Sequence, residues 1–136
     1  MNTFRFGRRQ VLGSAVGLLG AGYFGSRFLG AAEEKKVSTD CVKTCRECAE
    51  ICKECSACCL ENNPDCSAQC LACHHLCLAC ATSVEKGLPI AADVCALCEK
   101  MCLACAEMCT KCGKECCKKC IASCTACAEN CKKARA

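Results

Sequence analysis

Cysteines recur along this chain at alternating spacings of four and three residues. An α-helix turns once in about 3.6 residues, so this spacing keeps the sulfur atoms on one stripe of a helix. The stripe occupies the apolar positions of a helical bundle, with Cys where Leu would normally lie. Four runs follow the pattern: Cys41, Cys45, Cys48, Cys52, Cys55 and Cys59; Cys66, Cys70, Cys73, Cys77 and Cys80; Cys95, Cys98, Cys102, Cys105, Cys109 and Cys112; Cys117, Cys120, Cys124, Cys127 and Cys131.

Turn residues separate the four runs and predict where each helix ends. Asn63 and Pro64 suit the N-cap and first position of a helix, Gly87 and Pro89 break the chain, and Gly113 is typical of a helix C-terminus. We therefore expect helices over 41–61, 64–86, 90–112 and 114–133, the first capped by Thr39 or Asp40. Short connections favour antiparallel neighbours. The prediction is all-α: one antiparallel up-down-up-down four-helix bundle with a Cys-lined core, over residues 41–136, after a flexible lead-in at 33–40.

The first 32 residues have the features of an export signal rather than of a folded segment. Arg8 and Arg9 form a twin-arginine pair, and a weakly apolar, glycine-rich stretch follows as far as Leu29. Cleavage is expected after Ala31 or Ala32. The glycines argue against a spanning helix, which needs about 20 mostly apolar residues. We expect export to the bacterial periplasm by the twin-arginine pathway, with no stable membrane insertion after cleavage.

Removal of this signal changes the charge and the composition of the chain. Four arginines and no acidic residue lie in it, so 14 basic and 14 acidic residues remain, and nothing indicates a nucleic-acid surface. All four Phe and the one Tyr also lie in it. A domain of about 100 residues without aromatic side chains gains little stability from burial alone. Metal ions or disulfides are therefore expected to cross-link the core.

Disulfides, iron–sulfur clusters and zinc sites each offer an explanation for such dense cysteines. A disulfide scaffold is common in small exported domains, but it is rich in loops and has irregular spacings. An iron–sulfur electron carrier uses similar Cys spacings, but in loops that wrap a cluster. Zinc prefers closed sites of four ligands, into which a continuous stripe does not divide naturally. All three remain open as alternatives.

Multiple Cu(I) ions fit the pattern best. Soft thiolates select Cu(I), which accepts two or three sulfur atoms, so pairs on one helix or on facing helices suffice. Each thiolate carries one negative charge and each ion one positive charge. Bridging sulfurs therefore keep a filled core close to neutral, as burial requires.

Three runs of the sequence resemble those of the copper storage proteins, a family of Cys-rich four-helix bundles. They are Cys70-Leu-Ala-Cys73-His-His-Leu-Cys77-Leu-Ala-Cys80, Ala92-Asp-Val-Cys95-Ala-Leu-Cys98-Glu-Lys-Met-Cys102 and Cys117-Lys-Lys-Cys120-Ile-Ala-Ser-Cys124-Thr-Ala-Cys127-Ala-Glu-Asn-Cys131. The resemblance covers about residues 41–133. It implies high-capacity Cu(I) storage and assembly into homo-oligomers such as tetramers. We expect the stored copper to supply a copper enzyme or to serve detoxification. It also includes an exported branch with twin-arginine signals, which Arg8 and Arg9 match.

All 24 cysteines are candidate copper ligands, namely the four runs together with Cys58 and Cys116. In an antiparallel bundle one end gathers Cys58, Cys59, Cys66, Cys109, Cys112, Cys116 and Cys117. We expect copper to enter there, with Cys58, Cys112 and Cys116 as transfer ligands. Val84, Leu88, Pro89 and Ile90 are expected to close the opposite end, beside Cys41, Cys80, Cys95 and Cys131.

The remaining soft or apolar side chains are assigned packing roles. His74 and His75 are adjacent on one helix, so at most one can face the core, and surface or packing roles are expected for both. Met101 and Met108 are expected to fill space. With Leu97 and Ala104 they form a second apolar stripe that favours self-association. The chain shows no catalytic constellation and no thioredoxin-like strand pattern around a Cys-x-x-Cys, so we expect no enzymatic activity.

Overall fold

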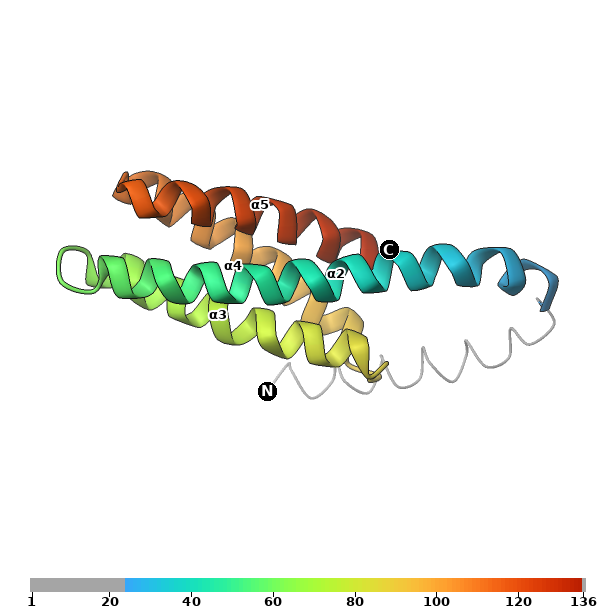
Figure 1. Ribbon diagram of the computed structural model, residues 1–136. Helices are drawn as coiled ribbons and strands as arrows, with labels where there is room; N and C mark the ends of the chain where they lie inside the picture. The colour runs from blue at the N-terminus through green and yellow to red at the C-terminus, as the bar shows by residue number, and fades with distance from the viewer. Residues whose placement is uncertain (1–23, 136) are drawn as a thin grey trace.

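The computed structural model describes residues 24–135, which form four helices (Figure 1). They are α2 (Phe24–Cys59), α3 (Pro64–Glu85), α4 (Ala91–Cys112) and α5 (Glu115–Arg135). α2 contacts α3 and α5, and α4 contacts the same two helices. Each helix thus runs against its neighbours in the chain, which confirms the predicted all-α, up-down-up-down bundle.

The start of the first helix differs from the sequence-based prediction. α2 already begins at Phe24, and residues 33–40 are helical rather than a flexible lead-in. The hydroxyl of Thr39 donates to the carbonyl oxygen of Lys35 at 2.7 Å, as a residue inside a helix does. The strong helix formers Ala, Glu and Lys at 31–36 outweigh the capping preference of Thr39 and Asp40. This part of α2 projects beyond the other helices in Figure 1.

The twin-arginine pair, and with it most of the predicted export signal, lies outside the described residues. The predicted cleavage position, after Ala31 or Ala32, falls within α2. No helix in the described part of the chain combines the length and the apolar character that crossing a membrane requires.

The predicted turns occur where the sequence places them. The Asn63 side chain accepts a hydrogen bond from the backbone N–H of Cys66 at 3.1 Å, and Pro64 occupies the first turn of α3. Gly113 adopts φ 69°, a left-handed conformation, and its N–H donates to the carbonyl oxygen of Cys109. The other helix boundaries lie within two residues of those expected.

The two ends of the bundle differ in how the helices are joined. The α2–α3 and α4–α5 connections lie together at one end, called the turn end (residues 58–66 and 109–117) (Figure 1). At the opposite end, polar side chains join neighbouring helices. These contacts are the ion pairs Arg46–Glu85 and Arg135–Glu99 and the hydrogen bond from Asn130 to Thr44.

Candidate metal centre

Sulfur fills the core of the bundle. Every cysteine of the four runs except Cys112 is buried, with an exposed fraction of at most 1%. The other buried apolar residues in the described part of the chain are the small Ala49, Ala81 and Ala128. Leu and Met side chains lie at the margin of the cluster or on the surface. The core is thus lined with ligand atoms in place of hydrocarbon.

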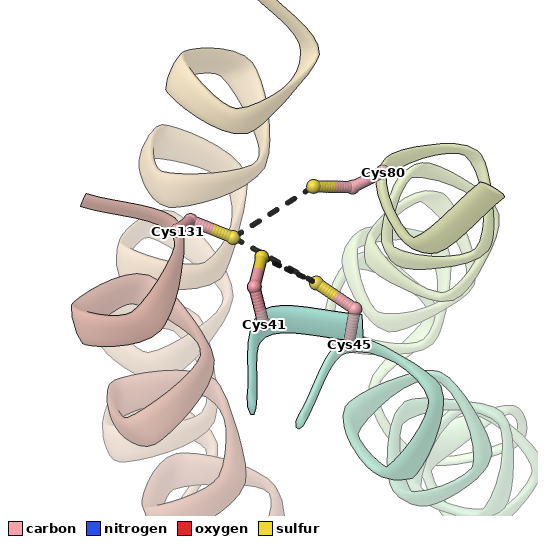
Figure 2. Close-up of side chains that lie close together, drawn as sticks. All are labelled: Cys41, Cys45, Cys80 and Cys131. Carbon is pink, nitrogen blue, oxygen red and sulfur yellow. Dashed lines mark hydrogen bonds between the residues drawn. The ribbon is translucent and has the colours of Figure 1, made fainter. Parts of the chain in front are cut away.

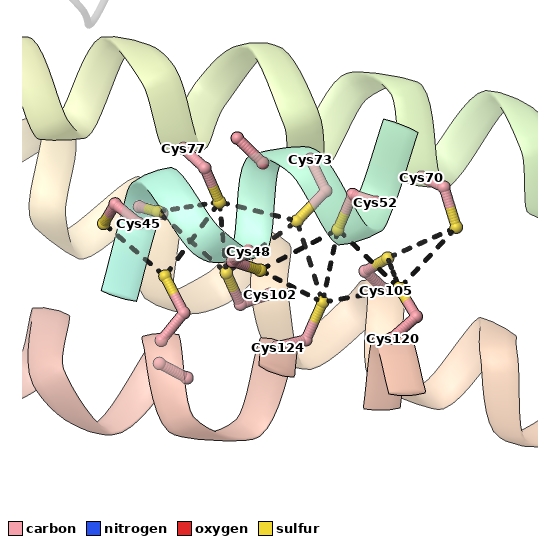
Figure 3. Close-up of a cluster of buried hydrophobic side chains, with 14 of the residues drawn as sticks. Cys45, Cys48, Cys52, Cys70, Cys73, Cys77, Cys102, Cys105, Cys120 and Cys124 are labelled. Atoms are coloured by element: carbon pink, nitrogen blue, oxygen red, sulfur yellow. Dashed lines mark hydrogen bonds between the residues drawn. The ribbon is translucent and has the colours of Figure 1, made fainter. Parts of the chain in front are cut away.

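The sulfur atoms form one continuous chain along the bundle axis, and Figure 3 shows the middle part of it. Cys59 Sγ, near the turn end, lies 3.9 Å from Cys112 Sγ and 3.7 Å from Cys117 Sγ. Further along, Cys45 Sγ lies 3.5 Å from Cys127 Sγ. Steps of at most 4.0 Å connect all 22 free thiols, from Cys112 at the turn end to Cys41 and Cys95 at the opposite end.

Groups of four cysteines recur along this chain, and they share members. Cys41, Cys45, Cys80 and Cys131 reach in from three helices, with their sulfur atoms all within 4.8 Å of one another (Figure 2). The same distance limit describes further groups, among them these four: Cys45, Cys98, Cys127 and Cys131; Cys48, Cys73, Cys77 and Cys102; Cys48, Cys52, Cys73 and Cys124; Cys52, Cys105, Cys120 and Cys124. The sequence did not predict groups of four. Because neighbouring groups overlap, filling all of them requires sulfur atoms that bridge two ions.

Burial keeps some of these thiols protonated when no metal is bound. Burial raises the pKa of Cys66 from its ordinary value of 9.0 to about 12, and it also raises the pKa values of Cys55 and Cys59. The buried polar side chains other than cysteine, within the described residues, are Ser56, Ser67 and Ser83, which carry no charge. Positive charge to balance thiolates in this core must therefore come from bound ions.

Cys112 is the accessible end of the sulfur chain. It is the last residue of α4 and its side chain is half-buried, whereas the other free thiols are buried. Burial acts to raise its pKa, but hydrogen bonds with Cys117, the backbone N–H of Lys114, Cys59 and Cys66 together outweigh it, so the pKa of Cys112 is lowered. That Cys112 is a first ligand for an incoming ion stays a prediction.

Cys58 and Cys116 do not join the sulfur chain. They form a disulfide between α2 and α5 at the turn end. This differs from the prediction that both are metal ligands, because a disulfide sulfur is not a thiolate. Their positions explain the difference. Cys58-Cys59 and Cys116-Cys117 are adjacent doublets, and on each helix only the second cysteine can follow the core stripe. The first of each doublet points outward, and the two meet.

The opposite end is closed differently from the expectation. Val84 packs against the core, but Leu88, Pro89 and Ile90 are exposed. The polar contacts of Arg46, Arg135 and Asn130 join the helices there instead. The thiols of Cys41, Cys80, Cys95 and Cys131 at this end are nevertheless buried.

The histidines and methionines take up packing and surface positions. His74 Nδ1 lies 2.7 Å from the carbonyl oxygen of Ala49, a hydrogen bond between α3 and α2, and His75 is exposed. Met101 Sδ accepts a hydrogen bond from Gln69 at 3.0 Å. Met108 packs against the outside of the sulfur core. These positions agree with the sequence-based interpretation of all four residues.

Comparison with known proteins agrees with this geometry. No curated protein and no solved structure matches the chain. The sequence profile of one family, described as "Csp: Copper storage protein", matches residues 34–136. This range contains all 24 cysteines and the whole bundle apart from the first part of α2. The chain therefore belongs to the copper storage protein family.

Proposed function

We propose that this protein stores Cu(I) ions on the cysteine thiolates that line its bundle, without catalysing a reaction. The observation that carries the proposal is the continuous chain of 22 free thiols, 21 of them buried, with sulfur atoms no more than 4.0 Å from their neighbours. A protein that needs one metal site for catalysis or structure uses three or four ligands. A chain of ligands along the whole bundle instead suits the holding of many ions.

Cu(I) satisfies the charge and the coordination of this core better than zinc does. A Zn²⁺ ion with four thiolates of its own leaves two negative charges, which no buried cation within residues 34–135 offsets. Overlapping groups such as those that share Cys45 and Cys131 also cannot each own four thiolates. Cu(I) accepts two or three sulfurs, and bridging lets the number of ions approach the number of thiols, so the filled core stays near neutral.

The free thiols set a lower figure for the capacity. With two thiols per ion, 22 thiols hold 11 ions, and bridging raises the number. We propose an anaerobic titration of the protein, with its disulfide intact, with Cu(I) in the presence of a chromophoric Cu(I) chelator. Uptake of 11 or more ions per chain before the chelator colours is expected. Saturation at a few ions would contradict storage.

The same samples distinguish the iron–sulfur alternative. Cu(I) has a filled d shell, so its thiolates are colourless in the visible range, whereas an iron–sulfur protein is brown. The cysteines of this protein lie on helices instead of in the loops that wrap such clusters. A colourless loaded protein is expected, and visible absorption that persists after purification would favour clusters.

We propose that the protein acts outside the bacterial cytoplasm, after export through the twin-arginine pathway. The support is the pair Arg8-Arg9 before a weakly apolar stretch. Replacement of both by Lys should retain the protein in the cytoplasm, whereas Arg5→Lys should not, as cell fractionation and immunoblotting would show. Equal export of the two variants would contradict this location.

Self-association is proposed for the outer surfaces of α3 and α4. Leu71, Leu78, Leu97 and Leu103 are between 38% and 54% exposed there, and such side chains often mark contacts between subunits. Light scattering after size-exclusion chromatography should give a mass that is a multiple of the chain mass. Leu97→Lys should lower that mass, and a monomeric parent protein would contradict the proposal.

The stored copper has two proposed uses, supply to a copper enzyme and detoxification. Both need the same core, so a gene deletion has to separate them. Loss of copper-enzyme activity at low copper would indicate supply, and loss of growth at high copper would indicate detoxification.

A further inference from the structure

One pair of cysteines is set apart from the other 22 by its oxidation state. Cys58 lies in the last turn of α2 and is exposed, and Cys116 lies in the first turn of α5 and is half-buried. They are joined by a disulfide, whereas sulfur atoms as close as 3.5 Å inside the core remain free thiols. Redox reagents in solution therefore meet the Cys58–Cys116 pair, here called the rim disulfide, before they meet the core.

The rim disulfide lies directly outside the accessible end of the sulfur chain. Cys59 and Cys117 follow its two cysteines in the sequence, and their sulfur atoms lie 3.7 Å apart. Cys112, the half-buried thiol at this end, lies 3.9 Å from Cys59. Lys114, in the α4–α5 connection, donates to the carbonyl oxygen of Cys58 at 3.5 Å. The disulfide thus links α2 to α5 at the place where the stored ions are nearest to solution.

We propose that the rim disulfide is a redox-controlled gate on the metal store, which a dithiol opens and oxidation closes. This inference rests on the proposed storage of Cu(I) in the core. In the closed form, Cys112 is the one free thiol that is not buried. In the open form, Cys58 and Cys116 add two thiols beside it, and no disulfide joins α2 to α5. Ions then have three thiols through which to enter or leave.

Opening is an ordinary thiol–disulfide exchange. One thiolate of the dithiol attacks the exposed Cys58 sulfur, which breaks the bond to Cys116 and forms a mixed disulfide. The second thiol of the dithiol then attacks the reagent sulfur of this mixed disulfide, which closes a disulfide within the reagent and releases the Cys58 thiol. Two electrons and two protons pass to the protein, which gains two thiols, and the dithiol becomes a disulfide. Closing is the reverse reaction with a disulfide oxidant.

The gate predicts that the redox state of one pair controls the rate of metal transfer more than the capacity. The full chain would be prepared with the rim disulfide intact or reduced by dithiothreitol, which is then removed anaerobically. Thiol titration in denaturant should count 22 and 24 free thiols in the two forms. Both forms would be loaded with Cu(I), and removal by excess chelator followed by stopped flow. We expect Cu(I) to be removed at least about threefold faster from the reduced form, because that form has three outer thiols and the oxidised form has one.

Two variants separate the gate from a general effect of reduction. Cys58→Ser with Cys116→Ser can neither form the disulfide nor offer its thiols, so treatment with dithiothreitol should leave its removal rate unchanged. Cys131→Ser, a buried thiol at the opposite end, should lower the capacity slightly and keep the dependence on redox state.

The outcomes distinguish failure of the gate from failure of storage. Equal removal rates from the two wild-type forms, at high capacity, would overturn the gate and leave storage intact. A rim disulfide that dithiothreitol cannot reduce in the folded protein would also overturn it. Uptake of only a few ions by both forms would instead overturn the storage on which the gate depends.

Discussion

Cysteine combines two properties at the residue scale that this core needs. As a neutral thiol it behaves as a small apolar side chain and can be buried without a partner charge. As a thiolate it binds soft metal ions. Because the pKa of Cys66 is raised to about 12, this buried side chain stays a neutral thiol until an ion displaces its proton. The same side chain therefore serves the empty and the filled protein.

Replacement of Cys112 tests where ions enter. Cys112→Ser should slow the initial loading of Cu(I), because it removes the half-buried thiol that solution reaches first. The capacity should fall by no more than about one ion, since the other thiols still bridge. Stopped-flow loading and equilibrium titration measure the two effects. Cys95→Ser, at the opposite end, is the control: it should lose a similar capacity and keep the loading rate of the parent protein. Equal loading rates of the two variants would place the entrance elsewhere.

Replacement of His74 tests whether histidine belongs to the metal core. His74→Ala should leave the Cu(I) capacity unchanged, because the ring is hydrogen-bonded to the Ala49 carbonyl oxygen. The free energy of unfolding of the copper-free protein should fall by about 1 kcal/mol, the usual net value of such a bond. Urea denaturation checks the stability. His75→Ala at the exposed neighbour should change little, and a capacity reduced by His74→Ala would identify a ligand.

At the scale of the helices, local sequence sets a helix boundary where the backbone adopts a conformation that few residues tolerate. Gly113 ends α4 in a left-handed conformation, and an added Cβ would meet no atom within 4 Å. Any cost of a side chain there is therefore a cost of the backbone conformation. By contrast, no residue near 40 requires a special conformation, and α2 continues through the predicted cap.

Gly113→Ala measures that backbone cost. The free energy of unfolding should fall by about 1 kcal/mol, the penalty of a left-handed residue with a Cβ. Thr110→Ala, three residues earlier on the exposed face of α4, serves as the control and should change stability by less than about 0.5 kcal/mol. Urea denaturation of the reduced, copper-free protein compares the two. An unchanged stability of Gly113→Ala would mean that α4 and α5 can be joined by another turn.

At the scale of the whole molecule, protons and copper compete for one core. Burial raises the pKa values of Cys55, Cys59 and Cys66 in the folded state above the ordinary value of 9.0. Above pH 9 the unfolded chain loses these protons while the folded protein keeps them, so unfolding becomes more favourable. Stability contributed by these groups is complete below about pH 9 and is lost as the pH rises toward 12.

These three thiols should therefore make the reduced, copper-free protein progressively less stable between pH 9 and pH 12. The copper-loaded protein should not follow this trend, because ions have already replaced the protons and also stabilise the folded state by binding to it. Thermal unfolding followed by circular dichroism across this range gives the comparison. Parallel declines in both forms would show that the core thiols are not the copper ligands.

The sequence by itself determined the four helices, their turns and the residues of the core. A stripe of cysteines at helical spacing, and residues such as Pro64 and Gly113 that require special backbone geometry, act within a few positions of the chain. Only the tertiary structure decided which sulfurs meet across helices. The continuous chain, the overlapping groups of four and the Cys58–Cys116 disulfide depend on the rotation and axial position of each helix against its neighbours. Those follow from the packing of all four helices together, which no local pattern specifies.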